Sequence, residues 1–170
     1  MEIRLVRPEE HERLGELTVR AYAAIAPPAA QADLDTYQDE LRDVARRATG
    51  ADTLVAVDAD GTVLGGVTYV PDRSSAWAEF EDDDAAGIRM LAVDPSVQGR
   101  GIGEALTRSC IERAVARGRR QIVLHSTEWM KAAHRLYERM GFQRDRGLDW
   151  YVEEGAFWLL GFRLPLDNEG

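Results

Sequence analysis

Three features follow one another between residues 88 and 115, and together they limit the fold of this chain more than any other stretch does. Residues 88–93 are largely apolar, and Pro95 follows soon after them. Gly99, Gly101 and Gly103 come next. Apolar residues then recur at roughly helical spacing, namely Ala105, Leu106, Ile111, Ala114 and Val115. This order predicts a strand, a tight loop and a helix.

A glycine-rich loop at the start of a helix can bind phosphate. The first amides of a helix have no partner within it, and the helix dipole adds partial positive charge there. No Lys follows in the Walker pattern, and Glu104 stands where a dinucleotide-binding loop has its last glycine. The pattern that fits is Q-x-x-G-x-G, with Gln98, Gly101 and Gly103. The alternative is a simple glycine-rich turn before an ordinary helix.

A second motif lies about thirty residues further on. Residues 131–142 read K-A-A-H-R-L-Y-E-R-M-G-F. Ala133, Leu136, Tyr137 and Met140 fall on one face of a predicted helix. Gly141 is the residue type expected just after its end.

The two motifs together resemble the GNAT N-acetyltransferase superfamily. The loop is similar to its pyrophosphate loop, and L-Y-E-x-x-G-F at residues 136–142 is similar to the helix after its fifth strand. The resemblance implies that acetyl-CoA is the co-substrate, with its pantetheine arm between splayed fourth and fifth strands. It also implies that the backbone of Leu91, Ala92 and Val93 binds this arm and stabilises the oxyanion. The loop residues expected to bind the coenzyme are Gln98, Gly99, Arg100, Gly101, Ile102, Gly103 and Glu104.

Hydrophobic periodicity predicts the remaining elements. Strands are expected at residues 2–7, 53–57, 62–70, 88–93 and 121–125, near 142, and at 156–164. Helices are expected near residues 14–24, at 33–47, after the glycine loop and at 131–140. This order predicts an α/β fold with a mixed, mostly antiparallel central sheet and helices on both faces, as the resemblance also implies. Residues 1–170 are expected to form one domain.

Composition narrows the functional classes. The net charge of −9 disfavours nucleic-acid binding. No apolar run is long enough to span a bilayer, and the first residues lack the core of a secretory signal. Cys110 is the single cysteine, which excludes an intrachain disulfide and favours a cytoplasmic protein with Cys110 in its core. We expect no metal site, and a homodimer stays open.

Charge is distributed unevenly along the chain. Residues 99–120 carry a net charge of +4, which leaves −13 on the remainder. An anionic cofactor near the basic segment and a cationic substrate elsewhere would match this division.

Acetyl transfer needs an acid and a base, and the family resemblance implies which residue is the acid but leaves the base open. In similar enzymes the tyrosine of the L-Y-E ending protonates the departing sulfur, which makes Tyr137 the expected acid. The strand before the loop has no carboxylate for a general base. The acids of residues 79–84, namely Glu79, Glu81, Asp82, Asp83 and Asp84, and His125 stay as candidates. The resemblance also implies an Asn that contacts the pantetheine one or two turns before the tyrosine, and Met130 stands there instead.

Acceptor recognition is expected from residues 22–37, 74–84 and 144–154. In the last region Trp150 and Tyr151 lie among Asp149, Glu153 and Glu154, a combination that suits an ammonium group, although Trp150 could equally serve packing. The favoured function is acetyl-CoA-dependent N-acetyl transfer to a primary amine of a small molecule or a protein. The alternatives are a non-catalytic acyl-CoA sensor and a domain that binds ATP or NAD.

Overall fold

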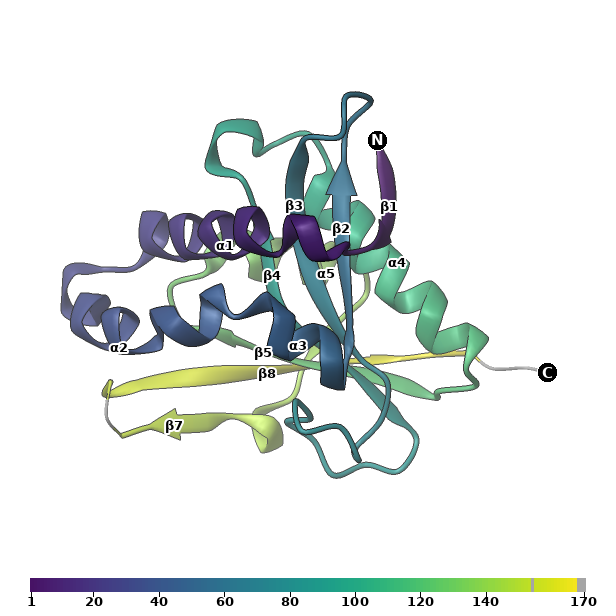
Figure 1. Cartoon of the computed structure of the whole chain (residues 1–170). Helices are drawn as coiled ribbons and strands as arrows, with labels where there is room; N and C mark the ends of the chain where they lie inside the picture. The colour runs from purple at the N-terminus through teal and green to yellow at the C-terminus, as the bar shows by residue number, and fades with distance from the viewer. Residues whose placement is uncertain (154, 168–170) are drawn as a thin grey trace.

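A single eight-stranded sheet with helices on both faces forms the protein in the computed structural model, which describes residues 1–153 and 155–167 (Figure 1). The strands are β1 (Glu2–Leu5), β2 (Asp52–Val57), β3 (Val63–Val70), β4 (Ala85–Val93), β5 (Gln121–Thr127), β6 (Gln143–Arg144), β7 (Trp150–Val152) and β8 (Phe157–Pro165). The α-helices are α1 (His11–Ile25), α2 (Gln31–Arg42), α3 (Val44–Gly50), α4 (Ile102–Ala116) and α5 (Lys131–Arg139).

The sheet is mixed and mostly antiparallel, as predicted. Its strand order is β1-β2-β3-β4-β5-β8-β6, with β7 added alongside β8. Only the β4–β5 pair is parallel among the described strands. Helices α1, α2 and α3 cover one face of the sheet, and α4 and α5 cover the other (Figure 1).

The helix predicted at residues 33–47 is wrong as a single element, because Asp43 divides it into α2 and α3. Asp43 has φ −81° and ψ 68°, which is not helical, and its carboxylate accepts a hydrogen bond from the Arg46 amide. Aspartate is a preferred residue at a helix N-cap because its side chain satisfies an otherwise unpaired amide. The buried Arg47 guanidinium stabilises the break by donating to the carbonyls of Glu40 (2.7 Å) and Leu41 (3.0 Å).

The C-terminal part of the sheet contains one strand more than predicted. The expected strand near Phe142 is only the short β6, while β8 agrees with the strand predicted at 156–164. Residues Trp150–Val152 form β7, which pairs with β8. Trp150 therefore has a strand-pairing role, which was one of the two roles considered for it. Glu154, which belonged to the predicted recognition region, lies outside the described residues.

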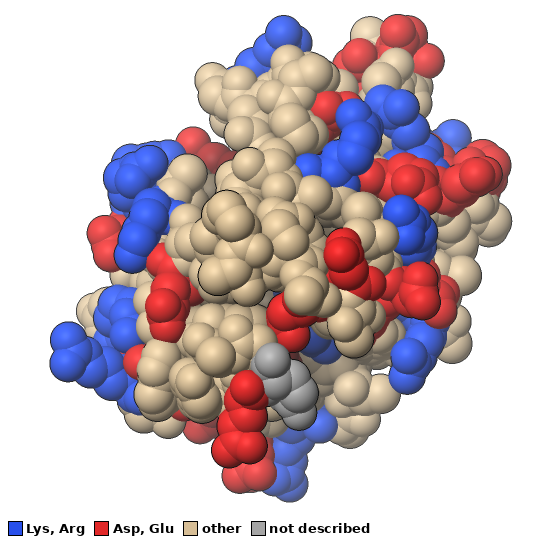
Figure 2. All heavy atoms as spheres, turned by 90° about the vertical axis from the view of Figure 1, so that its left-hand side faces the viewer, with Lys and Arg blue, Asp and Glu red and all other residues tan. Residues whose placement is uncertain are grey.

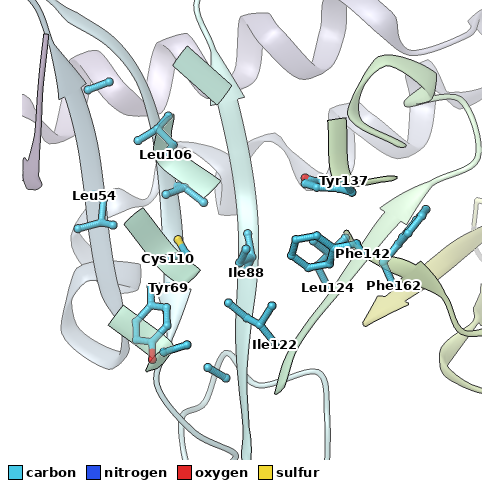
Figure 3. Packing of buried hydrophobic residues seen from close by; sticks show 14 of the residues in the cluster. Leu54, Tyr69, Ile88, Leu106, Cys110, Ile122, Leu124, Tyr137, Phe142 and Phe162 are labelled. Atoms are coloured by element: carbon cyan, nitrogen blue, oxygen red, sulfur yellow. The ribbon is translucent and has the colours of Figure 1, made fainter. Parts of the chain in front are cut away.

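The largest hydrophobic cluster lies between the sheet and helices α4 and α5. It includes Leu106 and Cys110 from α4, Ile88 from β4 and Phe162 from β8 (Figure 3). Cys110 is fully buried, as predicted, and burial raises the pKa of its thiol to about 12. The thiol is therefore protonated and shielded, as a core residue should be. No helix in the described part of the chain has the length and apolar character to cross a membrane.

Candidate functional site

Strands β4 and β5 are neighbours at one end and separate at the other. Their parallel pairing joins Ala85–Ile88 of β4 to residues 121–124 of β5 and ends at the pair Ile88 and Leu124. Beyond that pair, β4 continues to Val93 alongside β3 only, and β5 continues to Thr127 alongside β8 only. Figure 3 shows the two strands diverging beyond Ile88. The splay that the family resemblance implied is therefore present, and we call this opening the β4–β5 split.

An irregularity in β4 lies where the split begins. Met90 has φ 53°, in the left-handed region that residues with a side chain seldom adopt, and the register with β3 shifts between Gly66 and Thr68. Such a bulge inserts an extra residue into one strand and redirects the residues after it. Strained backbone of this kind is frequent at functional sites.

The backbone of β4 beyond the bulge presents hydrogen-bonding groups to the split. The Asp94 amide donates to the Leu64 carbonyl on the β3 side (2.8 Å). Because successive residues of a strand point their backbone groups to opposite edges, Ala92 also faces β3, while Leu91 and Val93 face the split. Of the three residues predicted to bind the pantetheine arm, these two can therefore do so through their backbone, whereas Ala92 cannot.

The glycine loop leads directly into α4, as predicted. Gly99 (φ 82°) and Gly101 (φ 77°) both have left-handed backbone conformations, and Gly101 is the N-cap of α4. The first helical hydrogen bond runs from the Ala105 amide to the Gly101 carbonyl (3.0 Å). The amides of residues 102–104 precede it and so have no helical acceptor, which fits them to bind the oxygens of a phosphate.

Side chains of the loop stay clear of these amides. Glu104 pairs with Arg108 one turn further along α4 (3.0 Å), which directs its carboxylate along the helix. Arg100 and Gln98 are exposed, and Gln98 Nε2 lies 3.5 Å from the Val93 carbonyl. Ile102 is buried in the core and anchors the start of the helix.

Gly103 brings the two sequence motifs together. A Cβ atom at this position would lie 3.5 Å from Leu136 Cδ2 of α5 and 3.7 Å from Val93 Cγ2 of β4. The start of α4, the end of β4 and the helix carrying Tyr137 therefore meet at one place, although they are far apart in the sequence.

We predict that Gly101→Ala weakens acetyl-CoA binding about tenfold. A residue with a Cβ in the left-handed region costs roughly 1–2 kcal/mol, and the loop relieves this strain by turning its amides away from the phosphate position. Gly118→Ala is the matched control, because Gly118 (φ 73°) follows the other end of α4 and also has open space around it. Calorimetric titration should show weaker binding for Gly101→Ala only; equal affinity in both variants would contradict the assignment of the loop.

Tyr137 lies in the core beside the split. It is 5% exposed, and its ring packs against Phe142 and Phe162 at centroid distances of 5.5 and 5.9 Å. Its hydroxyl oxygen lies on the side of the ring nearer β4 (Figure 3). Burial raises the pKa of the Tyr137 hydroxyl, so the group stays protonated throughout the neutral range. Tyr137 is thus a core residue whose protonated hydroxyl lies next to the split.

A cavity of about 580 Å³ opens on the α1–α2 side of the split. Its walls come from α1, α2, the connection before β4, the ends of β4 and β5, and the β7–β8 hairpin. Figure 2 views this side of the molecule, where acidic side chains border a largely uncharged surface. The lining includes the aromatic residues Tyr22, Tyr37, Trp129, Trp150 and Phe157. Its size is typical of a pocket for a small molecule.

One of the five acids in residues 79–84 reaches this cavity. Glu79 lines it and pairs with Arg89 of β4, with Oε1 and Nε 2.6 Å apart. Asp82 pairs with Arg163, and Asp83 pairs with Arg73. The two others also lie away from it: Glu81 is exposed, and Asp84 accepts a hydrogen bond from Gln121.

The cavity also contains charged residues that the sequence did not single out. Asp33 and Glu40 of α2 line it, as does Arg89, whose guanidinium lies over the Trp77 ring at 5.3 Å. Arg89 could be noticed as a charged residue within an apolar strand. Asp33 and Glu40 do not stand out in the sequence in this way, because they belong to a helix that is polar on most of its surface.

Of the two aromatic residues predicted to recognise an amine, Trp150 lines the cavity, while Tyr151 is 42% exposed and packs against Trp158. Met130, where the family resemblance implied an Asn, also lines the cavity. His125 contributes to the same wall.

Known proteins share both the sequence pattern and this architecture. The chain is 33% identical over 146 residues to N-acetylaspartate synthetase of Homo sapiens. The aligned region covers 86% of this chain and 43% of that relative. The chain thus spans less than half the length of this relative. A GCN5-related N-acetyltransferase from Kribbella flavida has the same fold, with a TM-score of 0.70 at 23% identity over 97% of each chain.

A GNAT superfamily phosphinothricin acetyltransferase from Sinorhizobium meliloti, solved in complex with acetyl-CoA, has a TM-score of 0.67 at 18% identity over 97% of this chain and 88% of that one. The profile of the acetyltransferase (GNAT) family matches residues 13–142, which include the split, the glycine loop and Tyr137. This match covers most of the chain. The chain therefore belongs to the acetyltransferase (GNAT) family.

Proposed function

We propose that this protein is an acetyl-CoA-dependent N-acetyltransferase whose acceptor is a small primary amine with additional positive charge. The observation that carries the proposal is the β4–β5 split, which has a glycine loop and a protonated tyrosine beside it and an acidic cavity on its other side. Family membership supports the acetyl donor. The single cysteine suits a cytoplasmic protein, and we propose that residues 1–170 act as one domain.

In this proposal the two ends of the coenzyme are held by different parts of the site. The diphosphate accepts hydrogen bonds from the amides of the loop formed by Gln98, Gly99, Arg100, Gly101, Ile102, Gly103 and Glu104. The pantetheine arm lies in the split and pairs with the backbone of Leu91 and Val93 as an added strand would. An amide of this strand also stabilises negative charge that develops on the thioester oxygen.

Acetyl transfer then needs one bond to form and one to break. The neutral amine attacks the thioester carbonyl carbon, the C–N bond forms, and the C–S bond breaks. Tyr137 gives its proton to the departing sulfur, and the amine nitrogen loses one proton to a base. The products are an amide and free coenzyme A thiol.

Charge in the cavity favours a cationic acceptor. Among the described lining residues, the carboxylates of Asp33, Glu40 and Glu79 outnumber the guanidinium of Arg89. Arg89 is itself engaged by Glu79. A second ammonium group would meet carboxylates and aromatic faces here, whereas an acceptor with two carboxylates would be repelled. On these grounds the acceptor differs in charge from the aspartate named in the N-acetylaspartate relative.

Thiol release from acetyl-CoA with a panel of amines tests the activity and the acceptor class together. We expect an aliphatic diamine to exceed aspartate at least tenfold in kcat/KM. A preference for aspartate would overturn the cationic class. Release at the level of the enzyme-free blank with every amine would overturn the enzyme and favour the non-catalytic acyl-CoA sensor. Thermal stabilisation by ATP or NAD instead of coenzyme A would favour a nucleotide-binding domain.

Substitution within the Glu79–Arg89 pair should change which acceptor the enzyme prefers. We predict that Glu79→Gln lowers kcat/KM for the diamine about tenfold and raises that for aspartate, because Arg89 then stands uncompensated in the cavity. Glu81→Gln is the matched control, since Glu81 lies in the same segment but is exposed and outside the cavity. If the acceptor preference shifted equally in both variants, the overall charge of the protein, and not the Glu79–Arg89 pair, would determine that preference.

A further inference from the structure

His125 lies at the split, on the face opposite Tyr137. It is the first residue of β5 beyond the last β4–β5 pair, and its ring lines the acceptor cavity. Alternation along a strand places neighbouring side chains on opposite faces. Leu124 packs in the same cluster as Tyr137, and Ser126 Oγ lies 3.1 Å from His134 Nε2 of α5, so both belong to the α4–α5 face. The His125 side chain therefore belongs to the acceptor face.

A backbone contact determines which ring nitrogen of His125 carries the proton. His125 Nε2 lies 2.8 Å from the Leu148 carbonyl oxygen. A carbonyl oxygen can only accept, so Nε2 must be the donor, and the neutral ring has its lone pair on Nδ1. Nδ1 is shielded from solvent and has no hydrogen-bond partner among the described residues.

The contact that orients the ring is itself firmly held. Leu148 ends the short 3₁₀ turn Arg146–Leu148, and its amide donates to the Asp145 carbonyl (3.1 Å). The next residue, Asp149, pairs with Arg144 through two contacts of 2.8 and 3.0 Å. The Trp150 ring meets the His125 ring edge-on, with centroids 6.4 Å apart. A carbonyl that orients a histidine from one side leaves the opposite nitrogen available as a base.

Glu79, which borders the same small void as His125, is less suited to accept a proton. Glu79 is committed to Arg89, with Oε1 and Nε 2.6 Å apart, so its carboxylate already has a cationic partner. The charged groups around His125 are this pair, the Asp149–Arg144 pair beside Leu148, and Asp33 and Glu40 on α2. A separate void of about 10 Å³ borders His125, Glu79 and Arg89, and it is large enough for one water molecule.

We propose that His125 is the general base of the transfer and accepts the amine proton at Nδ1. The inference rests on the proposed acetyltransferase function. As the amine nitrogen forms its bond to the acetyl carbon, its proton passes to the shielded Nδ1 through one water molecule in the void that borders His125. Tyr137 gives its proton to the sulfur on the other face of the split. The imidazolium then loses its proton and the tyrosinate regains one, so the cycle consumes no net proton.

His125→Gln tests this role through the pH dependence of the rate. Only a ring nitrogen with a free lone pair can accept the amine proton, so we expect wild-type kcat/KM to fall as the pH is lowered, and this fall is the acidic limb of the profile. We expect His125→Gln to lower kcat/KM about a hundredfold and to lose that acidic limb, with acetyl-CoA affinity unchanged by titration. Titration of the amine itself contributes equally to both profiles, because the same acceptor is used. Added imidazole should restore part of the rate.

His134→Gln is the matched control, because His134 is a buried histidine that contacts Ser126 and Thr127 on the α5 face. It should retain the acidic limb. A purely structural role of His125 would lower the rate equally at every pH without rescue by imidazole, and that result would overturn the proposal. Wild-type protein that releases no thiol with any amine would instead overturn the enzyme function itself.

Discussion

Tyr137→Phe should slow turnover by about ten- to a thousandfold while acetyl-CoA affinity stays near that of the wild type. Protonation assists departure of the coenzyme A sulfur, and Tyr137 is the proton donor in the proposed mechanism. Burial raises the pKa of its hydroxyl, so the proton is present before each transfer. Steady-state release of thiol measures turnover, and calorimetric titration measures coenzyme affinity.

Tyr69→Phe is the control for this substitution. Tyr69 belongs to the same hydrophobic cluster, is fully buried, and has a hydroxyl without a hydrogen-bond partner among the described residues. It lies on β3, away from the split. We expect Tyr69→Phe to leave turnover unchanged. If Tyr137→Phe also stayed within twofold of wild type, Tyr137 would be a core residue only.

Leu106→Ala should lower the free energy of unfolding by about 2–5 kcal/mol, the cost of removing a buried leucine and leaving a cavity. Leu106 is fully buried between α4 and the sheet. For a chain of this length the loss corresponds to a fall in Tm of about 10 °C. Thermal and denaturant unfolding would measure it. Because α4 carries the glycine loop, we expect acetyl-CoA to recover part of the loss by binding the native state.

Val115→Ala is the matched control on the same helix. Val115 is 43% exposed, and alanine has the higher helix propensity, so stability should change by less than about 0.5 kcal/mol. A loss as large as that of Leu106→Ala would mean that the exposed side of α4 is buried in solution, for example against a second copy of the chain.

The sequence predicted well those features that depend on neighbours along the chain. The strand, the glycine loop and α4 follow from residues within one stretch, because glycine tolerates left-handed backbone and a helix leaves its first amides unpaired. The end of α5, within the motif at residues 136–142, could be predicted for the same reason. The break at Asp43 was also local, and a capping aspartate inside an otherwise helical pattern was the signal that could have shown it.

The cavity depended on contacts between distant segments, which no local pattern encodes. Glu79, alone among five neighbouring acids, reaches the cavity because of the path of the connection before β4. The orientation of His125 depends on Leu148, which is 23 residues away in the chain. The side of β4 to which Leu91 and Val93 point depends on the pairing with β3 and on the bulge at Met90.

By itself, the sequence determined the fold class, the family and the glycine loop before α4, because periodicity, glycine placement and helix ends act over a few residues. The tertiary structure alone decided which acids line the cavity, which face of the split each catalytic candidate occupies, and which nitrogen of His125 contacts the Leu148 carbonyl. These depend on strand register and on the packing of α2 and the β7–β8 hairpin over the sheet, and such long-range contacts are set only when the whole chain is folded.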